Sequence, residues 1–376
     1  MRQRSFSGRA AIAVAAVTVT AAVGIPSATA QPGGGFLGSL RHNQVVASTI
    51  PANGDVNPYG VAVVPRSRGR LVAGDVLVSN FNNAPTTASP GGEQGRGTTL
   101  IEISPSGVRT QFARIPSASI RGRVGLTTAL VVLQTGWVIV GSLPTSDGTP
   151  ATMRAGELIV LDSTGRVRET IAGHGIDGPW DATALDLGKF AELFVTNVLT
   201  GIDGGQPSTT TKGNVVRLVL DLRGPLPRVL LSTVIANRLA VHTDPAALVV
   251  GPTGVALGPD GALYVADAVN SRIARVPDAI FRGSPVNARA ASSTITAGAP
   301  LNGPLGLAIA PNGDLLTVNG ADNNIIELTR TGAVVAERDL DPTDPPGGAL
   351  FGLAVTAFPG AVYYVNDDTN TLNVLH

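Results

Sequence analysis

The chain has 376 residues, a formal net charge of zero and no cysteine, and aromatic residues make up only 4% of it. This length suits two ordinary domains or one large all-β unit, and the lack of cysteine excludes a disulfide scaffold and a thiolate metal site. Basic residues form no run in the sequence, so we expect no nucleic-acid partner.

Residues 1–30 have the pattern of an export signal. Arg2, Arg4 and Arg9 precede the apolar run of residues 10–24, and Ala28-Thr29-Ala30 fits the small-x-small cleavage pattern. The run is short for a bilayer span, so a membrane anchor is the less favoured alternative. We expect a secreted, extracellular protein, with 24 basic and 27 acidic residues after cleavage and no later segment able to span a membrane.

After an expected flexible linker at residues 31–42, residues 43–376 are expected to form one domain built from a repeat. The clearest copy is residues 251–273, GPTGVALGPDGALYVADAVNSRI, and the stretch that begins at residue 303 aligns with it without a gap. A Pro-x-Gly start leads into a short apolar strand, a turn and a second strand, and these are hairpin signals.

Weaker copies of the repeat begin near residues 57, 126, 178 and 349. Strand-rich units that recur every 45–70 residues or so are typical of propeller blades. The last copy lacks a fourth strand, and residues 43–50 could supply it, which would hide an exposed edge. We therefore predict an all-β, six-bladed β-propeller of four-stranded blades, closed by an N-terminal strand that joins the C-terminal blade; the alternative is a disordered N-terminal tail.

Residues 252–276 closely resemble an NHL repeat, residues 304–329 resemble one less closely, and the chain as a whole is similar to NHL-repeat six-bladed β-propellers. The resemblance implies that the first strand of each blade lines a central channel. It also implies that the connectors between blades share one face with the turns between second and third strands. It does not imply a function, since the family includes scaffolds, binding modules and enzymes.

Two sets of equivalent positions are candidates for a binding site. The first ends each second strand and is small and polar: Asn80, Ser142, Asn197, Asp267, Asn319 and Asn366. The second is the middle position of each Pro-x-Gly start or its equivalent: Tyr59, Thr128, Trp180, Thr253, Leu305 and Phe351. The first set could serve turn chemistry, or bind sugar hydroxyls or a cation. The aromatic members of the second could be packing residues, or an apolar floor on which a ligand stacks.

A metal site is the alternative. Six-bladed calcium-dependent lactonases resemble this chain in fold and place oxygen ligands near the second set, where this chain offers only Asp181, the residue after Trp180. Related lyases hold zinc with connector histidines; here His174 and His242, with Asp181 or Asp244, would be the ligands. The expectation is therefore no cofactor, with one calcium or zinc ion in this alternative.

Long segments are expected to form a wall on one side of the channel mouth: residues 81–97, 143–156, 198–213 and 235–250. Tolerated surface insertions are the other explanation. The favoured function is a monomeric, non-catalytic binding or scaffold module for a partner protein, a glycan or a small ligand. The alternatives are a metal-assisted lactonase, hydrolase or lyase, and a structural spacer.

Overall fold

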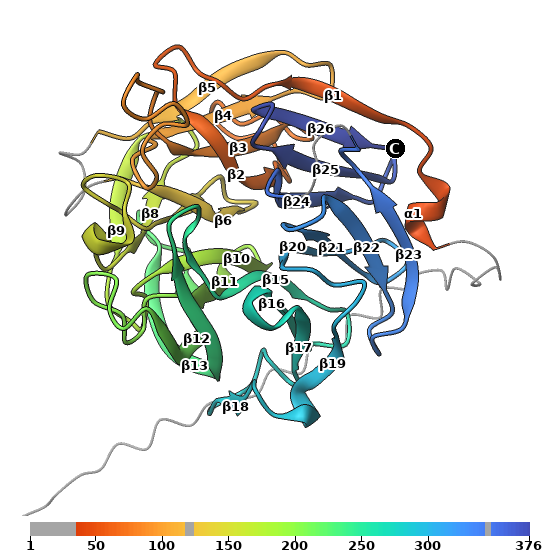
Figure 1. Cartoon of the computed structure of the whole chain (residues 1–376). Coiled ribbons are helices and arrows are strands. Elements are labelled where there is room, and N and C mark those ends of the chain that lie inside the picture. Colours follow the sequence, from red (N-terminus) through yellow and green to blue (C-terminus); the bar gives the residue numbers. More distant parts are fainter. Residues whose placement is uncertain (1–34, 117–123, 343–346) are drawn as a thin grey trace, which may run out of the picture. The chain divides into compact units, whose positions relative to one another are not determined.

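The computed structural model describes residues 35–116, 124–342 and 347–376, so the expected export signal at residues 1–30 lies outside the described residues. Six antiparallel sheets surround a common axis (Figure 1). The prediction of an all-β, six-bladed propeller is confirmed. Among the described residues, no helix has the length and apolarity needed to cross a membrane.

Each blade has four strands that follow one another from the axis outward. The first blade is β2 (Val56–Val63), β3 (Val76–Asn82), β4 (Thr99–Ile103) and β5 (Arg109–Arg114). The second is β6 (Leu126–Val132), β7 (Val138–Ser142), β8 (Glu157–Leu161) and β9 (Val167–Ile171). The third is β10 (Pro179–Asp186), β11 (Phe190–Asn197), β12 (Thr209–Asp221) and β13 (Arg228–Asp244), to which β14 (Leu248–Val250) and β18 (Val286–Asn287) are added.

The remaining blades repeat this order. The fourth is β15 (Pro252–Leu257), β16 (Leu263–Asp267), β17 (Arg272–Val276) and β19 (Thr294–Ala297). The fifth is β20 (Pro304–Ile309), β21 (Leu315–Asn319), β22 (Asn324–Leu328) and β23 (Val334–Asp339). The sixth is β24 (Leu350–Thr356), β25 (Ala361–Asn366), β26 (Thr371–Leu375) and β1 (Asn43–Ser48).

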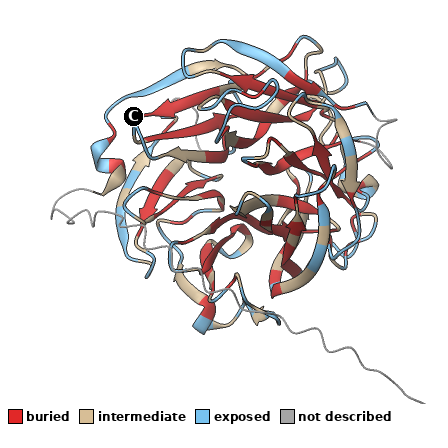
Figure 2. Cartoon of the chain, turned by 180° about the vertical axis from the view of Figure 1, so that it is seen from behind, coloured by how far each residue is buried: buried red, intermediate tan, exposed pale blue. Residues whose placement is uncertain are grey.

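Burial follows the position of a strand within its blade. Second strands are buried along nearly their whole length, whereas the outer strands β5 and β23 are largely exposed (Figure 2). Neighbouring blades share apolar clusters; Leu77 and Leu100 of the first blade, for example, pack with Val140 of the second. The hydrophobic core is therefore a set of contacts between blade faces, and each blade needs its neighbours to bury its surface.

The ring is closed as predicted by an N-terminal strand. β1 pairs antiparallel with β26, with Asn43 opposite Leu375 and Ser48 opposite Thr371. Backbone N–H groups of Arg41 and His42 also donate to the carbonyl of His376. The edge of β26 is thus covered by the other end of the chain, which removes an exposed template for strand pairing.

The part of the expected linker that the structure describes packs against the ring. Residues Phe36–Ser39 form the short helix α1, and the backbone N–H groups of Phe36 and Leu37 donate to the Glu327 carboxylate at 2.7 and 2.8 Å. Leu37 and Leu40 are buried in the apolar cluster between the fifth and sixth blades. The buried Glu327 therefore depends on the N-terminal segment for two of its hydrogen bonds.

The segment at residues 235–250, expected to be a long connector, is mostly strand. β13 continues for 17 residues to Asp244, and after a turn β14 pairs back with it, Val250 opposite His242. The expectation was wrong because β13 runs on past the other outer strands, pairing with an equally extended β12 from Thr209 onward.

A chain that begins at residue 49 should lose most of its stability compared with one that begins at residue 31. Its β26 edge would be open and Glu327 would be buried without two donors. We expect a melting temperature lower by about 10 °C or more, measured by calorimetry, with aggregates in size-exclusion chromatography. Equal melting temperatures and a monomeric shortened chain would contradict this account of ring closure.

Candidate functional site

The strand register places the polar set at equivalent positions in all six blades. The second set is in register in five blades, but the bulge of the second blade holds one more residue, so Thr128 lies two residues after the paired Leu126. In each blade the polar residue pairs with the residue that opens the Pro-x-Gly start or its equivalent; it ends the second strand in five blades, and in the first blade β3 continues two residues past Asn80. These pairs are Pro58–Asn80, Leu126–Ser142, Pro179–Asn197, Pro252–Asp267, Pro304–Asn319 and Leu350–Asn366. A β-bulge follows each pair and shifts the first strand relative to the second.

The polar set is buried and its hydrogen bonds are used locally. Asn197 Oδ1 accepts from the backbone N–H of Asp177 at 3.2 Å, and Asn319 Oδ1 accepts from that of Asn302 at 3.1 Å. In the same way Asn80 donates to the Thr49 carbonyl at 3.1 Å. Each of these bonds holds the connector that enters the same blade, as turn chemistry predicts.

The other members of the polar set also form hydrogen bonds or ion pairs within the protein. Ser142 accepts from the N–H of Gly125 at 3.2 Å, and Asn366 donates to the Asp341 carboxylate at 2.6 Å. Asp267 forms a buried ion pair with Arg272, N to O 2.7 Å. Being buried, the set presents no open surface to sugar hydroxyls.

The aromatic candidates form one buried cluster across the axis. The Tyr59 ring centroid lies 4.2 Å from that of Phe351, 5.9 Å from that of Trp180 and 4.5 Å from that of Phe81. The first and third blades are not neighbours, so the contact between Tyr59 and Trp180 reaches over the axis. Tyr59, Trp180 and Phe351 are only 1%, 2% and 8% exposed, which is the arrangement of packing residues.

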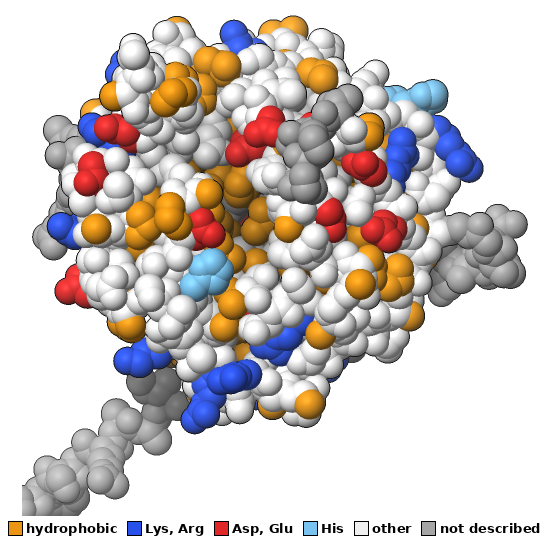
Figure 3. Space-filling view, in the orientation of Figure 1, with side chains coloured by type: hydrophobic (Ala, Val, Ile, Leu, Met, Phe, Trp, Pro, Cys, Tyr) orange, Lys and Arg blue, Asp and Glu red, His pale blue; other side chains and the backbone are white. Residues whose placement is uncertain are grey.

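Side chains from the long loops pack into this cluster, and a hydrogen bond joins two of the segments that surround it. Met153, Leu199 and Ile202 belong to the same apolar cluster as Tyr59. Gln94 Nε2 donates to the Ala246 carbonyl at 2.6 Å, so the loop of the first blade is tied to the turn between β13 and β14. Figure 3 shows this face, with a central hollow that hydrophobic side chains line. The loops surround this hollow and the buried aromatic cluster closes the axis below it; we call this end of the axis the connector end.

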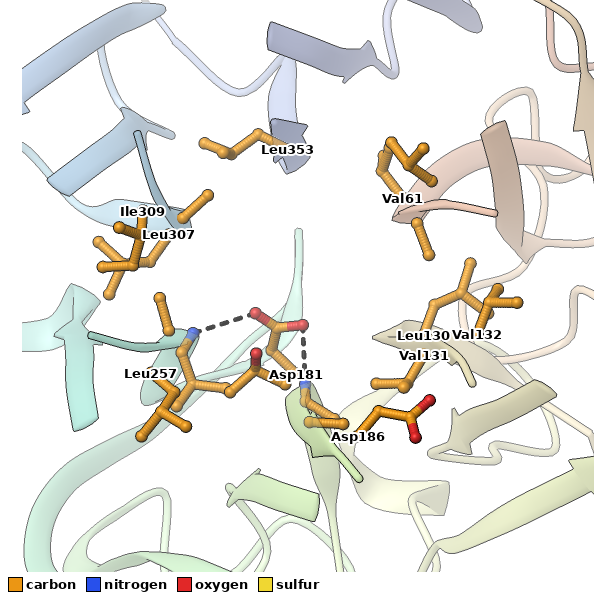
Figure 4. Close-up of a pocket in the computed structure, with 18 of the residues that line it drawn as sticks. Val61, Leu130, Val131, Val132, Asp181, Asp186, Leu257, Leu307, Ile309 and Leu353 are labelled. Carbon is orange, nitrogen blue, oxygen red and sulfur yellow. Dashed lines mark hydrogen bonds between the residues drawn. The ribbon is translucent and has the colours of Figure 1, made fainter. Parts of the chain in front are cut away.

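The other end of the axis holds a channel with a volume of about 340 Å³. Its wall is made by the later halves of the six first strands and is mainly aliphatic: Val61, Val63, Leu130, Val132, Leu257, Leu307, Ile309 and Leu353 (Figure 4). Val63, Val132, Leu257 and Ile309 are partly exposed, whereas the connector end is buried. The channel therefore opens toward the turns that join first to second strands.

Close packing of the first strands around the axis leaves no room for a side chain at one position of the repeat. A Cβ on Gly254 would lie 2.2 Å from the Leu305 carbonyl oxygen, and one on Gly352 would lie 2.2 Å from that of Tyr59. Gly306 and Gly60 are confined in the same way. The glycine of the Pro-x-Gly start is thus required by the approach of the next blade.

Asp181 occupies this glycine position in the third blade. Its carboxylate accepts from the backbone N–H of Ala182 at 2.8 Å and from that of Val255, in the next blade, at 3.1 Å. Figure 4 shows the carboxylate inside the channel among aliphatic side chains. Desolvation by burial raises the pKa of Asp181 to about 7, and the two hydrogen bonds only partly oppose this.

Sequence reasoning found Asp181 only as a charge beside Trp180. The signal that could have identified Asp181 was an acidic residue at the position where other copies of the repeat have glycine. Sequence reasoning missed the hydroxyl groups that link one blade to the next. Thr196 Oγ1, for example, accepts from the N–H of Asp181 at 3.0 Å and donates to the Thr253 carbonyl at 2.9 Å.

The ligands of the alternative metal site are not brought together. His174 is exposed on the connector into the third blade, and the His242 ring lies 3.2 Å from the carbonyl of Thr243. Within the described ranges, no three His, Cys, Asp or Glu side chains converge as metal ligands would. Asp181 therefore stands in the channel without His174, His242 or Asp244 as co-ligands.

Comparisons with known proteins support the fold. The NHL repeat model matches residues 250–275, so the predicted NHL resemblance is confirmed on the copy that carried it. No curated protein sequence matches the chain.

Three solved structures are similar to this one. A gluconolactonase from Xanthomonas campestris has a TM-score of 0.55 at 13% identity, covering 90% of both chains. An aldose sugar dehydrogenase from Streptomyces coelicolor, bound to PQQ, has a TM-score of 0.51 at 14% identity, covering 89% of this chain and 98% of its own. An inactive variant of virginiamycin B lyase from Staphylococcus aureus, with quinupristin, has a TM-score of 0.49 at 15% identity, covering 89% of this chain and 85% of its own. At these identities the likeness to the first two concerns the fold alone.

Asp181→Asn should remove a pH dependence of stability. The pKa of Asp181 is about 7 in the folded protein against 3.8 ordinarily, so between these values the folded state holds a proton that the unfolded chain has lost. The free energy of unfolding therefore falls as pH rises from about 4 to about 7, by at most about 4 kcal/mol.

Urea unfolding at pH 4.5, 6 and 8 measures this effect. At pH 8 the free energy of unfolding of the asparagine variant should equal or exceed that of the wild type. At pH 4.5 the variant should no longer be the more stable of the two. Asp203→Asn, at an exposed loop position, is the matched control and should keep the wild-type slope. Parallel pH profiles for wild type and Asp181→Asn would show that the channel does not hold this proton.

Proposed function

We propose that this protein is an exported, non-catalytic binding propeller whose channel takes a small, elongated and mainly apolar ligand with one hydrogen-bond donor. The observation that carries the proposal is the Asp181 carboxyl group, which lies inside a channel of about 340 Å³ whose side chains are mainly aliphatic, with Asp186 as the other acidic residue of the wall. Ligand pockets typically combine an apolar wall with a few polar groups that fix orientation.

The chemistry of the channel selects the ligand class. Aliphatic side chains bind through burial of apolar area, and Asp181, Thr183 and Asp186 are the lining side chains that could bond a ligand's polar groups. One N–H donor is already bonded to each carboxylate oxygen of Asp181, and each oxygen can accept another. A primary amine or an alcohol on an alkyl chain fits this arrangement, and the amine gains most when the carboxyl is ionised.

The binding surface differs from the one that the sequence favoured. Tyr59, Trp180 and Phe351 close the connector end, so their proposed role is to form the base of the site instead of a stacking floor. We keep export as part of the proposal because of the charged, apolar and small-residue pattern of residues 1–30. A monomer is also proposed, since the ring closes on itself.

A metal-assisted lactonase or lyase is the alternative. The fold likeness to a gluconolactonase suggests it, but this likeness extends to the fold only. Such an enzyme would need several oxygen or nitrogen ligands around one ion, and in the described channel wall Asp181 and Asp186 are the only charged groups. Elemental analysis of the purified protein, with melting in the presence and absence of EDTA, separates the two proposals.

Thermal shift and calorimetric titration with n-octylamine, n-octanol, n-octane and glucose test the binding function. We expect the amine and the alcohol to raise the melting temperature, and glucose to leave it unchanged. Asp181→Asn should weaken amine binding about tenfold while changing binding of n-octane little, since one charge-assisted hydrogen bond is lost.

A channel-filling variant localises the ligand. Ala308→Phe adds a ring to the channel wall and should abolish binding of both amine and alcohol, whereas Ala172→Phe, on an exposed connector, should not. Stoichiometric calcium or zinc, with a large loss of melting temperature on chelation, would replace the binding proposal with the metal-dependent alternative.

A further inference from the structure

Apolar side chains are exposed on the face where the channel opens. Phe358 is 97% exposed and Phe281 is 86% exposed, while Leu187 and Val72 are 62% and 50% exposed. Each stands on a turn that joins a first to a second strand or a third to a fourth strand. In an antiparallel blade all of these turns lie at the same end, which we call the hairpin face and which is opposite the connector end.

The hairpin face is also basic. Its turns contain nine Arg and Lys residues against five Asp residues and no Glu. Three of the exposed apolar residues have a basic neighbour in the same turn: Leu187 has Lys189, Phe281 has Arg282, and Val72 has the exposed Arg70. Of the five acids, Asp162 and Asp260 form ion pairs with arginines, and of the nine basic residues Arg223 is paired with Asp221 at the end of β12.

The opposite face has the reverse charge. Among the described connectors and second-to-third turns there are nine Asp and Glu residues, against Arg96 and Arg154 as the only Arg or Lys. Figure 3 shows several of these acidic side chains around the central hollow of that face. The described part of the chain is therefore polarised along its axis, and an anionic surface would attract its hairpin face and repel its connector face.

We propose that the hairpin face docks onto an anionic membrane surface, with Phe281 and Phe358 inserted among the lipids. Side chains that are almost fully exposed on separate turns suit a fluid partner that closes around each of them. A protein partner instead favours a contiguous, packed hot spot. Apolar insertion combined with basic residues is how peripheral proteins hold anionic lipid surfaces.

This docking places the open end of the channel against the membrane. An apolar ligand could then pass from the lipid into the channel without crossing water. Docking depends on surface residues alone, so a failure of vesicle binding would leave the proposed channel ligand untouched, and a failure of ligand binding would leave the docking untouched. Asp181 and the channel wall are not needed for the docking itself.

Vesicle flotation tests the docking. The test uses residues 31–376, because residues 10–24 are apolar and could bind vesicles themselves, and because residues 36–376 contain the whole closed ring. Vesicles of equal phosphatidylglycerol and phosphatidylcholine should carry the protein, and vesicles of phosphatidylcholine alone should carry at least tenfold less. Raising the salt from 50 mM to 500 mM should also weaken binding, since screening reduces the attraction (about 10 Å Debye length at 0.1 M).

Two double variants distinguish docking through the hairpin face from non-specific adsorption of exposed apolar side chains. Phe281→Ser with Phe358→Ser should lower partitioning into the anionic vesicles at least tenfold while leaving the melting temperature unchanged. Leu230→Ser with Leu231→Ser removes two exposed leucines from the outer strand β13 and should leave partitioning unchanged.

Three results would overturn the proposal. They are no flotation with anionic vesicles, flotation that both double variants retain equally, and self-association of the wild type that the phenylalanine variant abolishes without any vesicle binding. The last would assign the face to a protein contact.

Discussion

The whole structure depends on how closely six first strands approach one another around the axis. At Gly60, Gly254, Gly306 and Gly352 the next blade is so near that a Cβ would meet its backbone or side chains. This constraint explains the repeated Pro-x-Gly start, and hydroxyl groups such as that of Thr196 bridge the remaining gaps between blades. The second and third blades lack this glycine, and in the third blade Asp181 stands in its place. The replacement puts a carboxyl group into an aliphatic channel, where its pKa rises because its charge is poorly solvated.

The proposed function follows from the difference between the two ends of this axis. At the connector end, where the sequence predicted a binding mouth, the aromatic cluster closes the axis beneath the hollow that the loops surround. At the hairpin end the channel is open, and the turns around it are basic and carry exposed phenylalanines. The small polar residues that end the second strands serve the connectors, so the ring of asparagines is a structural feature of every blade.

Much of the fold could be predicted because its signals are local. The Pro-x-Gly starts, the turns and the alternation of strands repeat within each copy, and the missing fourth strand of the last copy pointed to closure by residues 43–50. Contacts between distant segments could not be predicted in this way. Phe36 and Leu37 reach Glu327 across about 290 positions of sequence, and Tyr59 meets Trp180 only because the ring closes. The basic character of the hairpin face could not be predicted either, because its arginines are scattered over turns of different blades.

The central claim is that Asp181 is held in the channel with a pKa near neutrality. A ¹³C NMR titration of the aspartate carboxyl carbons, with the Asp181 signal identified by its loss in an asparagine variant, measures this directly. The account predicts a midpoint at about pH 7 for that signal. A midpoint near pH 4, the ordinary value for aspartate, would mean that the carboxyl is fully solvated and that the channel is not the site described here.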